Sequence, residues 1–201
     1  MGYVEGLDFL SSDITWQRSG NFFYKTFKTK SGTALLLGCT HTFWGEIAGR
    51  IVAYLAEMGV KRIIYSGKLG TLNPDLIPNQ SLATGNLSIL PNGQVVIWKN
   101  LFENIHHKKI YHGVHITIPS VLQENINWAL TQKETISFVD PEIGHMAYAA
   151  QTSGVEYSYL HIISDNLCRK YQYDLSNERE NNVIAHRQIL LKIIGQAIIE
   201  L

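Results

Sequence analysis

The chain has 201 residues, of which 45% are hydrophobic and 17% are charged, as in a globular domain large enough to bury a core. Lysine plus arginine and aspartate plus glutamate both number 17, so no net charge favours nucleic acid or an acidic membrane surface as a partner. The longest apolar runs fall short of the roughly 20 residues that a membrane span requires, and we therefore expect no membrane partner.

The first third of the chain is predicted to alternate between strands and a helix. The elements in chain order are strands at 22–27 and 33–40, joined by a turn at 30–32, a helix at 46–58 and a strand at 60–66. Gly59 ends the helix, and residues 67–70 are interpreted as a glycine turn that closes the last strand. Residues 33–67 thus form a strand–helix–strand unit, which implies parallel strands with a right-handed crossover.

The remainder of the chain continues the α/β pattern. The predicted elements are strands at 81–90, 94–98 and 111–118, a helix at 120–130, an extended segment at 136–139, a helix at 141–153, a strand at 155–164, a loop at 167–175 and a helix at 177–199. Asp140 suits the N-cap of the helix at 141–153, and Gly154 suits its end. We predict a single α/β domain over residues 1–201, with three layers in which helices flank a mixed central β-sheet.

Two acids stand at the ends of predicted elements. Glu142 lies in the opening turn of the helix at 141–153, and Asp165 directly follows the apolar strand at 155–164. Ligands of open α/β sheets bind at the carboxyl ends of strands and at helix N-termini. The pair of acids therefore predicts a small-molecule site that handles hydroxyl groups and protons.

Three segments resemble the nucleoside phosphorylase-I superfamily, which contains purine nucleoside phosphorylases, uridine phosphorylases and methylthioadenosine/adenosylhomocysteine nucleosidases. Residues 59–76 are similar to its central strand, glycine turn and following loop. Residues 139–142, Val-Asp-Pro-Glu, resemble its Glu-Met-Glu signature, and residues 163–166, Ile-Ser-Asp-Asn, resemble its Ser-Asp motif. The order and spacing of the segments also agree, so the resemblance implies one phosphorylase/hydrolase-like domain.

The resemblance implies a role for each matching residue. Glu142 matches the glutamate that grips the ribose 2′- and 3′-hydroxyls, where a carboxylate stabilises an oxocarbenium-like sugar. Asp165 matches the aspartate that donates a proton or hydrogen bond to the departing purine, and Ser164 would orient it. Further substrate-binding positions are expected at Ser66, Gly67, Lys68, Ser120 and Asn166. His41 is a candidate catalytic base, ribose contact or ordinary loop histidine.

The chain departs from the superfamily pattern at the anion site. It is short at the N-terminus and lacks the glycine/arginine loop, and Tyr65 replaces the arginine that ends the central strand. The small-residue turn after the second strand has become bulky at Phe43 and Trp44. Bidentate arginine contacts to phosphate are therefore not expected, although Lys68 could bind an anion as a point charge. No metal or organic cofactor is implied, and phosphate is a candidate co-substrate.

These observations give three function hypotheses. The first is cleavage of the N-glycosidic bond of a nucleoside or modified nucleoside, purine preferred, with water or phosphate as acceptor, by a homo-oligomer. The alternative is a catalytically inactive relative that binds a nucleoside or serves as an assembly subunit. The third is an enzyme that modifies a carbohydrate or nucleotide on the same fold.

The remaining histidines and cysteines receive structural interpretations. The histidines at 106, 107, 112 and 115 match no metal-binding spacing, and His161 is expected in the core of its strand. Cys39 and Cys168 also lack such spacing. We expect them to be reduced thiols of a cytoplasmic protein.

Overall fold

The computed structural model describes residues 10, 13–29, 32–41, 43–172 and 179–201. Its central sheet has eight strands in the order β8-β7-β10-β11-β5-β13-β6-β9 and contains both parallel and antiparallel pairs. In chain order these strands are β5 (Lys68–Thr71), β6 (Leu82–Thr84), β7 (Leu87–Ile89), β8 (Val95–Ile97), β9 (Ile110–His112), β10 (His115–Thr117), β11 (Phe138–Asp140) and β13 (His161–Asn166). A mixed central sheet was predicted, and the structure confirms it.

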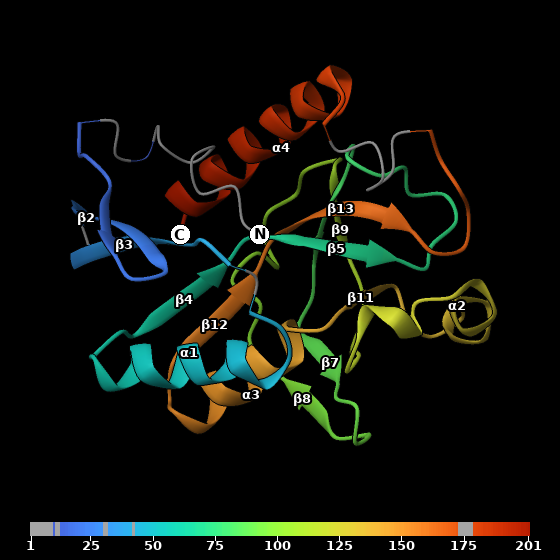
Figure 1. The fold of residues 1–201 in the computed structure, drawn as a ribbon, viewed down its shortest axis with the longest axis horizontal. Helices are drawn as coiled ribbons and strands as arrows, with labels where there is room; N and C mark the ends of the chain where they lie inside the picture. Colours follow the sequence, from blue (N-terminus) through green and yellow to red (C-terminus); the bar gives the residue numbers. More distant parts are fainter. Residues whose placement is uncertain (1–9, 11–12, 30–31, 42, 173–178) are drawn as a thin grey trace.

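Helices cover both faces of this sheet (Figure 1). The helices are α1 (Glu46–Glu57), α2 (Ile126–Gln132), α3 (Ile143–Thr152) and α4 (Asn181–Ile199). Ile162 of β13 belongs to the same buried cluster as Ile194 of α4, whereas the next residue, Ile163, clusters with Ile143 of α3. Successive strand residues point to opposite faces, so α3 and α4 lie on opposite sides of the sheet.

Helix α1 packs against α3 through small residues. Gly49 comes so close to α3 that a Cβ atom built on it would lie 2.8 Å from the backbone oxygen of His145. Large apolar side chains of α1 and of its C-cap residue point elsewhere, with exposures of 53% for Ile47, 62% for Tyr54 and 67% for the C-cap Met58. No helix within the described residues is long and apolar enough to cross a membrane.

Two smaller sheets correct the predicted strand–helix–strand unit. Strands β1 (Gln17–Ser19), β2 (Phe22–Thr29) and β3 (Gly32–Cys39) form an antiparallel sheet, and β4 (Arg62–Tyr65) pairs with β12 (Glu156–Tyr159). Strand β3 bonds along its whole length to its hairpin partner β2 and lies in a different sheet from β4. The prediction that these two strands of residues 33–67 run as a parallel pair was therefore wrong.

Several predicted strands are divided by bends. The strand predicted at 81–90 becomes β6 and β7, that at 111–118 becomes β9 and β10, and that at 155–164 becomes β12 and β13. The bend between β6 and β7 lies against the bend between β9 and β10. The two are so close that a Cβ atom built on Gly85 would overlap the carbonyl oxygen of Gly113. Strands β6 and β9 pair on one side of this contact, and β7 and β10 pair on the other. Because both residues at the contact are glycines, the two segments of the chain can bend at the same place without a steric clash.

Other boundaries also differ from expectation. Residues 68–70 of the predicted glycine turn belong to β5 (Lys68–Thr71) instead, because this segment pairs with strands on both sides. The helix predicted at 120–130 is a short 3-10 helix, η2 (Val121–Gln123), followed by α2. Asn125 separates the two by accepting a hydrogen bond from the backbone N–H of Trp128 at 3.1 Å, as an N-cap. Residues 30–31, 173–178 and most of 1–12 lie outside the described residues.

Candidate functional site

Gly70 lies between the two strands that carry the predicted acids. It pairs with Val139 of β11 on one side and with Asp165 of β13 on the other. A Cβ atom on Gly70 would lie 3.0 Å from Asp165 Oδ2 and 3.2 Å from Val139 Cγ1. Neighbouring strands lie about 4.8 Å apart, so the two acid-bearing strands are roughly 10 Å apart across Gly70. The structure thus brings Asp165 into the same region as the segment that contains Asp140 and Glu142.

Asp165 follows an irregularity in β13. The pairing with β5 passes from Ile163 directly to Asp165, so Ser164 is the extra residue of a bulge. The Ser164 hydroxyl donates a hydrogen bond of 2.7 Å to Asp165 Oδ1. The bulge therefore turns the serine so that it can hold the aspartate carboxyl, as the sequence motif suggested.

Glu142 immediately precedes α3 and is only 6% exposed. Asp140 caps the helix, because its Oδ1 accepts hydrogen bonds from the backbone N–H groups of Glu142 at 2.9 Å and Ile143 at 2.8 Å. Asp140 thus binds the first turn of the helix, but the helix begins at Ile143 and its N-cap residue is Glu142, so the predicted N-cap position of Asp140 and the start at Pro141 were wrong. One buried carboxylate therefore fixes the backbone that carries the other acid.

The two carboxyl groups have opposite pKa shifts. Burial, followed by the negative charge of Asp140, raises the pKa of Glu142 to about 9. Burial has the largest single effect and would raise the pKa of Asp140, but His115, His161 and the backbone N–H of Ile143 together outweigh it and the pKa is lowered overall. Glu142 is therefore the protonated member of the pair at neutral pH in the unliganded site.

Glu124 is a third acid that the sequence analysis missed. It lies between η2 and α2, and burial, followed by the charges of Asp165 and Asp140, raises its pKa to about 8. Its interaction with both Asp165 and Asp140 places it near the two acid-bearing strands. The only signal in the sequence was its nearness to Ser120, in a segment that the superfamily motifs align poorly.

The predicted substrate-binding residues 66–68 lead from β4 into β5. Gly67 is buried, and a Cβ atom there would lie 3.1 Å from His161 Nε2 and 3.4 Å from the Tyr65 hydroxyl. Ser66 precedes it in the link between β4 and β5. Lys68 begins β5 and is two residues from Gly70, so both face the side of the strand on which the Asp165 carboxylate lies.

Tyr65 does not reproduce the charge of the arginine that it replaces. Its ring packs edge-on against His161, with 4.5 Å between the ring centroids. Burial, followed by the charge of Glu142, raises the pKa of Tyr65 well above its usual value, so its hydroxyl is neutral. His161 is fully buried, as expected of a core histidine, and burial lowers its pKa to about 3.

Three other predicted substrate-binding residues have different surroundings. The Ser120 hydroxyl oxygen accepts a hydrogen bond from the backbone N–H of Leu122 at 3.2 Å and caps η2. The Asn166 amide donates to the backbone oxygens of Asn73 at 2.7 Å and Leu76 at 3.0 Å, so its two amide protons hold a loop. His41 lies exposed in a bend after β3. A substrate contact for His41 therefore stays a prediction.

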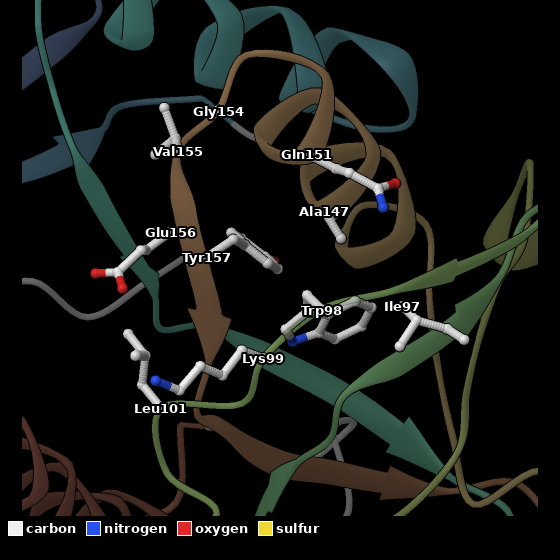
Figure 2. A pocket seen from close by; sticks show the side chains of 10 residues that line it. All are labelled: Ile97, Trp98, Lys99, Leu101, Ala147, Gln151, Gly154, Val155, Glu156 and Tyr157. Carbon is white, nitrogen blue, oxygen red and sulfur yellow. The ribbon is translucent and has the colours of Figure 1, made fainter.

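A separate cavity of about 290 Å³ opens between β12, the C-terminal end of α3 and the segment after β8 (Figure 2). Trp98 and Tyr157 point into it, whereas Glu156 points away. Its lining includes none of the predicted site residues. Within the described part of the chain, no three histidine, cysteine, aspartate or glutamate residues are grouped to hold a metal ion.

No protein-family model matches the sequence, and no curated protein matches it. Solved structures match over nearly the whole chain. The 5′-methylthioadenosine/S-adenosylhomocysteine nucleosidase of Helicobacter pylori is 15% identical, with a TM-score of 0.76 over 98% of this chain and 94% of that one. The futalosine hydrolase of Helicobacter pylori is also 15% identical, with a TM-score of 0.76 over 98% of this chain and 93% of that one.

A uridine phosphorylase from Vibrio fischeri is 10% identical, with a TM-score of 0.76 over 98% of this chain and 87% of that one. These similar structures are nucleosidases and a nucleoside phosphorylase, the kinds of protein that make up the superfamily whose motifs the sequence resembles. The chain therefore has the phosphorylase/hydrolase-like fold that the motifs implied.

Proposed function

We propose that the chain cleaves the N-glycosidic bond of a nucleoside, with purine nucleosides preferred. The observation that carries this proposal is the placement of Asp165 and the Asp140–Glu142 segment on the two neighbours of β5, on either side of Gly70. The fold shared with nucleosidases and a nucleoside phosphorylase supports it. In this arrangement Asp165 acts on the base and Glu142 binds the sugar.

The chemistry follows from how the glycosidic bond breaks. Its electron pair leaves with the base, and Asp165 donates a proton or a hydrogen bond to a base nitrogen, which is worth on the order of 10²–10⁴ in rate. The sugar that remains is oxocarbenium-like and positively charged. Glu142 hydrogen-bonds the sugar hydroxyls, and the ionised Asp140 below it stabilises that charge.

The acceptor is water or phosphate, and an oxygen of either one attacks the anomeric carbon. Lys68 is the candidate contact for phosphate, because it shares a face of β5 with Gly70, next to the Asp165 carboxylate. The neutral and largely enclosed Tyr65 offers no positive charge to an anion. No cofactor takes part in the proposed reaction.

The test is base release from adenosine, inosine, guanosine, uridine and 5′-methylthioadenosine, each with and without phosphate. Release that requires phosphate identifies a phosphorylase, and release without it identifies a nucleosidase. Asp165→Asn should abolish release yet retain nucleoside binding in calorimetry, whereas Asp75→Asn, in an exposed turn, should leave both unchanged. Equal turnover in the wild type and Asp165→Asn would contradict the assigned role of Asp165.

The second candidate is a non-catalytic relative that binds a nucleoside. The bulky turn after β3 favours it, because Phe43 stacks on Phe22 of β2, with ring centroids 5.7 Å apart. The superfamily has small residues at this turn, which leave room for a nucleoside. Nucleoside binding without base release, in the wild type and in Asp165→Asn alike, would support this candidate.

The proposal includes a homo-oligomer in a reducing cytoplasm. Exposed apolar side chains on α1 and at its C-cap, namely Ile47, Tyr54 and Met58, support an assembly, since such surfaces are commonly buried between subunits. Cys39 and Cys168 are both free thiols, as a reducing compartment would maintain. Sedimentation equilibrium of the purified protein tests the assembly, and a monomer at all concentrations would contradict it.

A further inference from the structure

A chain of buried polar contacts begins and ends at the first turn of α3. The backbone N–H of Gly144 donates to Thr117 Oγ1 at 2.8 Å, and Thr117 Oγ1 lies 3.1 Å from Ser88 Oγ. Ser88 Oγ is 2.9 Å from His115 Nδ1, and His115 Nε2 is 3.1 Å from Asp140 Oδ1, which is an ion-pair distance although the geometry is not that of a hydrogen bond. Asp140 in turn caps α3, which closes the circuit.

The strand order builds this circuit into the sheet. Ser88, His115 and Asp140 come from β7, β10 and β11, which are consecutive neighbours. His115 pairs with Ser88 on one side, and Thr117 pairs with Asp140 on the other. The side chains of all four are essentially buried. Groups buried this deeply must find their hydrogen-bond partners within the protein.

Counting protons gives the circuit a direction. An N–H group can only donate, so Thr117 accepts from Gly144 and has its own hydroxyl proton left to donate to Ser88. Ser88 then donates to Nδ1 of His115, and the proton of the imidazole resides on Nε2, which faces Asp140. If His115 Nδ1 instead donated to Ser88, and Ser88 to Thr117, the Thr117 hydroxyl proton would have no acceptor among the contacts of the described residues.

We propose that His115 is a positioning residue for Glu142. Ser88 and Thr117 orient the imidazole so that its Nε2–H group holds the Asp140 carboxylate under α3, where Asp140 fixes the backbone of Glu142. This inference rests on the proposed function in one respect, namely that Glu142 binds the sugar. The circuit itself can be tested without any turnover.

The electrostatics agree with this role. His115 lowers the pKa of Asp140 against the effect of burial, so it favours the ionised carboxylate that capping requires. Other titratable groups also interact with the pair. His161 acts on Asp140, Glu124 acts on both carboxyls, and the carboxylates shift the pKa values of Tyr65, His145, Tyr157 and Tyr159. Without the imidazole, Asp140 would be a buried carboxylate that keeps its two backbone N–H partners but has lost its ion-pair partner among the side chains.

Two variants of nearly equal size separate positioning from packing. In His115→Gln the terminal amide can place an N–H group close to the position of Nε2. The shorter side chain of His115→Asn reaches only the position of Nδ1. We expect His115→Asn to raise the KM for the nucleoside on the order of tenfold with a smaller change in kcat, and His115→Gln to restore most of the loss. His112→Gln, an exposed residue on β9, is the matched control.

The second measurement is nitrogen NMR of protein labelled at histidine. The expected result is a His115 that carries a proton on Nε2, and a change of this signal in Ser88→Ala, which removes one oxygen. A proton on Nδ1 alone, or a His115 signal that Ser88→Ala leaves unchanged, would overturn the circuit. Equal KM values in the wild type, His115→Asn and His115→Gln would overturn the positioning role. Absence of turnover in the wild type would count against the proposed function, while the NMR result would still decide the circuit.

Discussion

The backbone N–H of Glu142 donates a 2.9 Å hydrogen bond to the carboxylate of Asp140, two residues earlier in the chain. This contact keeps two buried carboxyl groups close together at the start of α3. Both cannot be ionised there at low cost, since like charges in a buried site repel. The structure resolves the conflict by lowering the pKa of Asp140 and raising that of Glu142.

Stability should therefore fall as the pH rises through the Glu142 transition. The folded pKa of about 9 lies above the ordinary value of 4.5, so the native state binds the proton more tightly between these limits. Its contribution is fully present below pH 4.5 and is lost as the pH rises through about 9. Glu142→Gln stays neutral, so its melting temperature should rise relative to the wild type as the pH increases from 5 to 9.

Thermal unfolding at several pH values in that range measures this difference. Each kcal/mol should shift the melting temperature by roughly 2–4 °C in a chain of this size. Glu124→Gln should show the same direction with its midpoint near pH 8, because the pKa of Glu124 is also raised. If the melting temperatures of Glu142→Gln and the wild type differed by the same amount at every pH, Glu142 would be ionised in the folded protein.

The opposite pH dependence is expected from His161. Its folded pKa of about 3 lies below the ordinary 6.5, so the unfolded chain binds the proton first as the pH falls. The wild type should lose on the order of 3 kcal/mol from this group between pH 6.5 and pH 4. His161→Phe removes the titration and should flatten the acid side of the stability curve in urea unfolding. The exposed His106→Gln is the control, and an equal flattening there would refute the assignment.

Gly70→Ala should damage the site more than the fold. The new Cβ atom would lie 2.6 Å from Leu167 Cδ1 and 3.0 Å from Asp165 Oδ2, so the leucine side chain must shift and the carboxyl must move by a few tenths of an ångström. A displacement of about 1 Å in a catalytic group can cost on the order of 10²-fold in rate, which is the upper limit for this smaller shift, whereas overpacking costs about 1–3 kcal/mol. Base release and the melting temperature should be measured together.

Gly85→Ala is the comparison for that experiment. Its Cβ atom would meet the carbonyl oxygen of Gly113 and the Tyr159 hydroxyl, and not Asp165. We expect it to lower stability with a smaller loss of kcat in the protein that remains folded. If both alanine variants reduce kcat equally, crowding at Asp165 is not the cause.

The ion pair between Arg62 and Glu156 should contribute little. Arg62 Nε lies 2.8 Å from Glu156 Oε2 and links β4 to β12, but the two side chains are 43% and 51% exposed. Exposed pairs of this kind contribute about 0–1 kcal/mol, and salt screens them. Glu156→Gln should lower the free energy of unfolding by less than about 1 kcal/mol at low salt and by almost nothing at 1 M sodium chloride.

Local sequence signals predicted two of the helices closely, although the helix expected at 120–130 is divided into η2 and α2. The helix expected at 46–58 is α1 (Glu46–Glu57), and that expected at 141–153 is α3 (Ile143–Thr152). Apolar spacing and end-capping residues act over only a few residues, so the sequence of a helical segment is enough to predict that helix. The sequence did not predict which face of α1 is buried. The close approach to α3 places Ala48, Gly49 and Val52 in the contact in place of larger apolar residues.

Strand partners and the wider site depend on residues far apart in the chain. The bends at Gly85 and Gly113 exist because the two glycines meet, which neither segment reveals alone. In the same way, motif matches identified Glu142 and Asp165, but the strand order is what brings His115 beside Asp140. In the sequence, His115 is an isolated histidine in an apolar strand.

The central place of β5 also bears on how the protein folds during synthesis. Its neighbour β13 is synthesised much later than β5. The hydrogen bond from the Ser164 hydroxyl to the Leu69 carbonyl, for example, joins residues 95 positions apart. Contacts of such long sequence separation form slowly, because a large loop must close first. A nascent chain that ends at α3 would already hold Glu142 against Asp140, yet one edge of β5 would still be open to pairing with another chain.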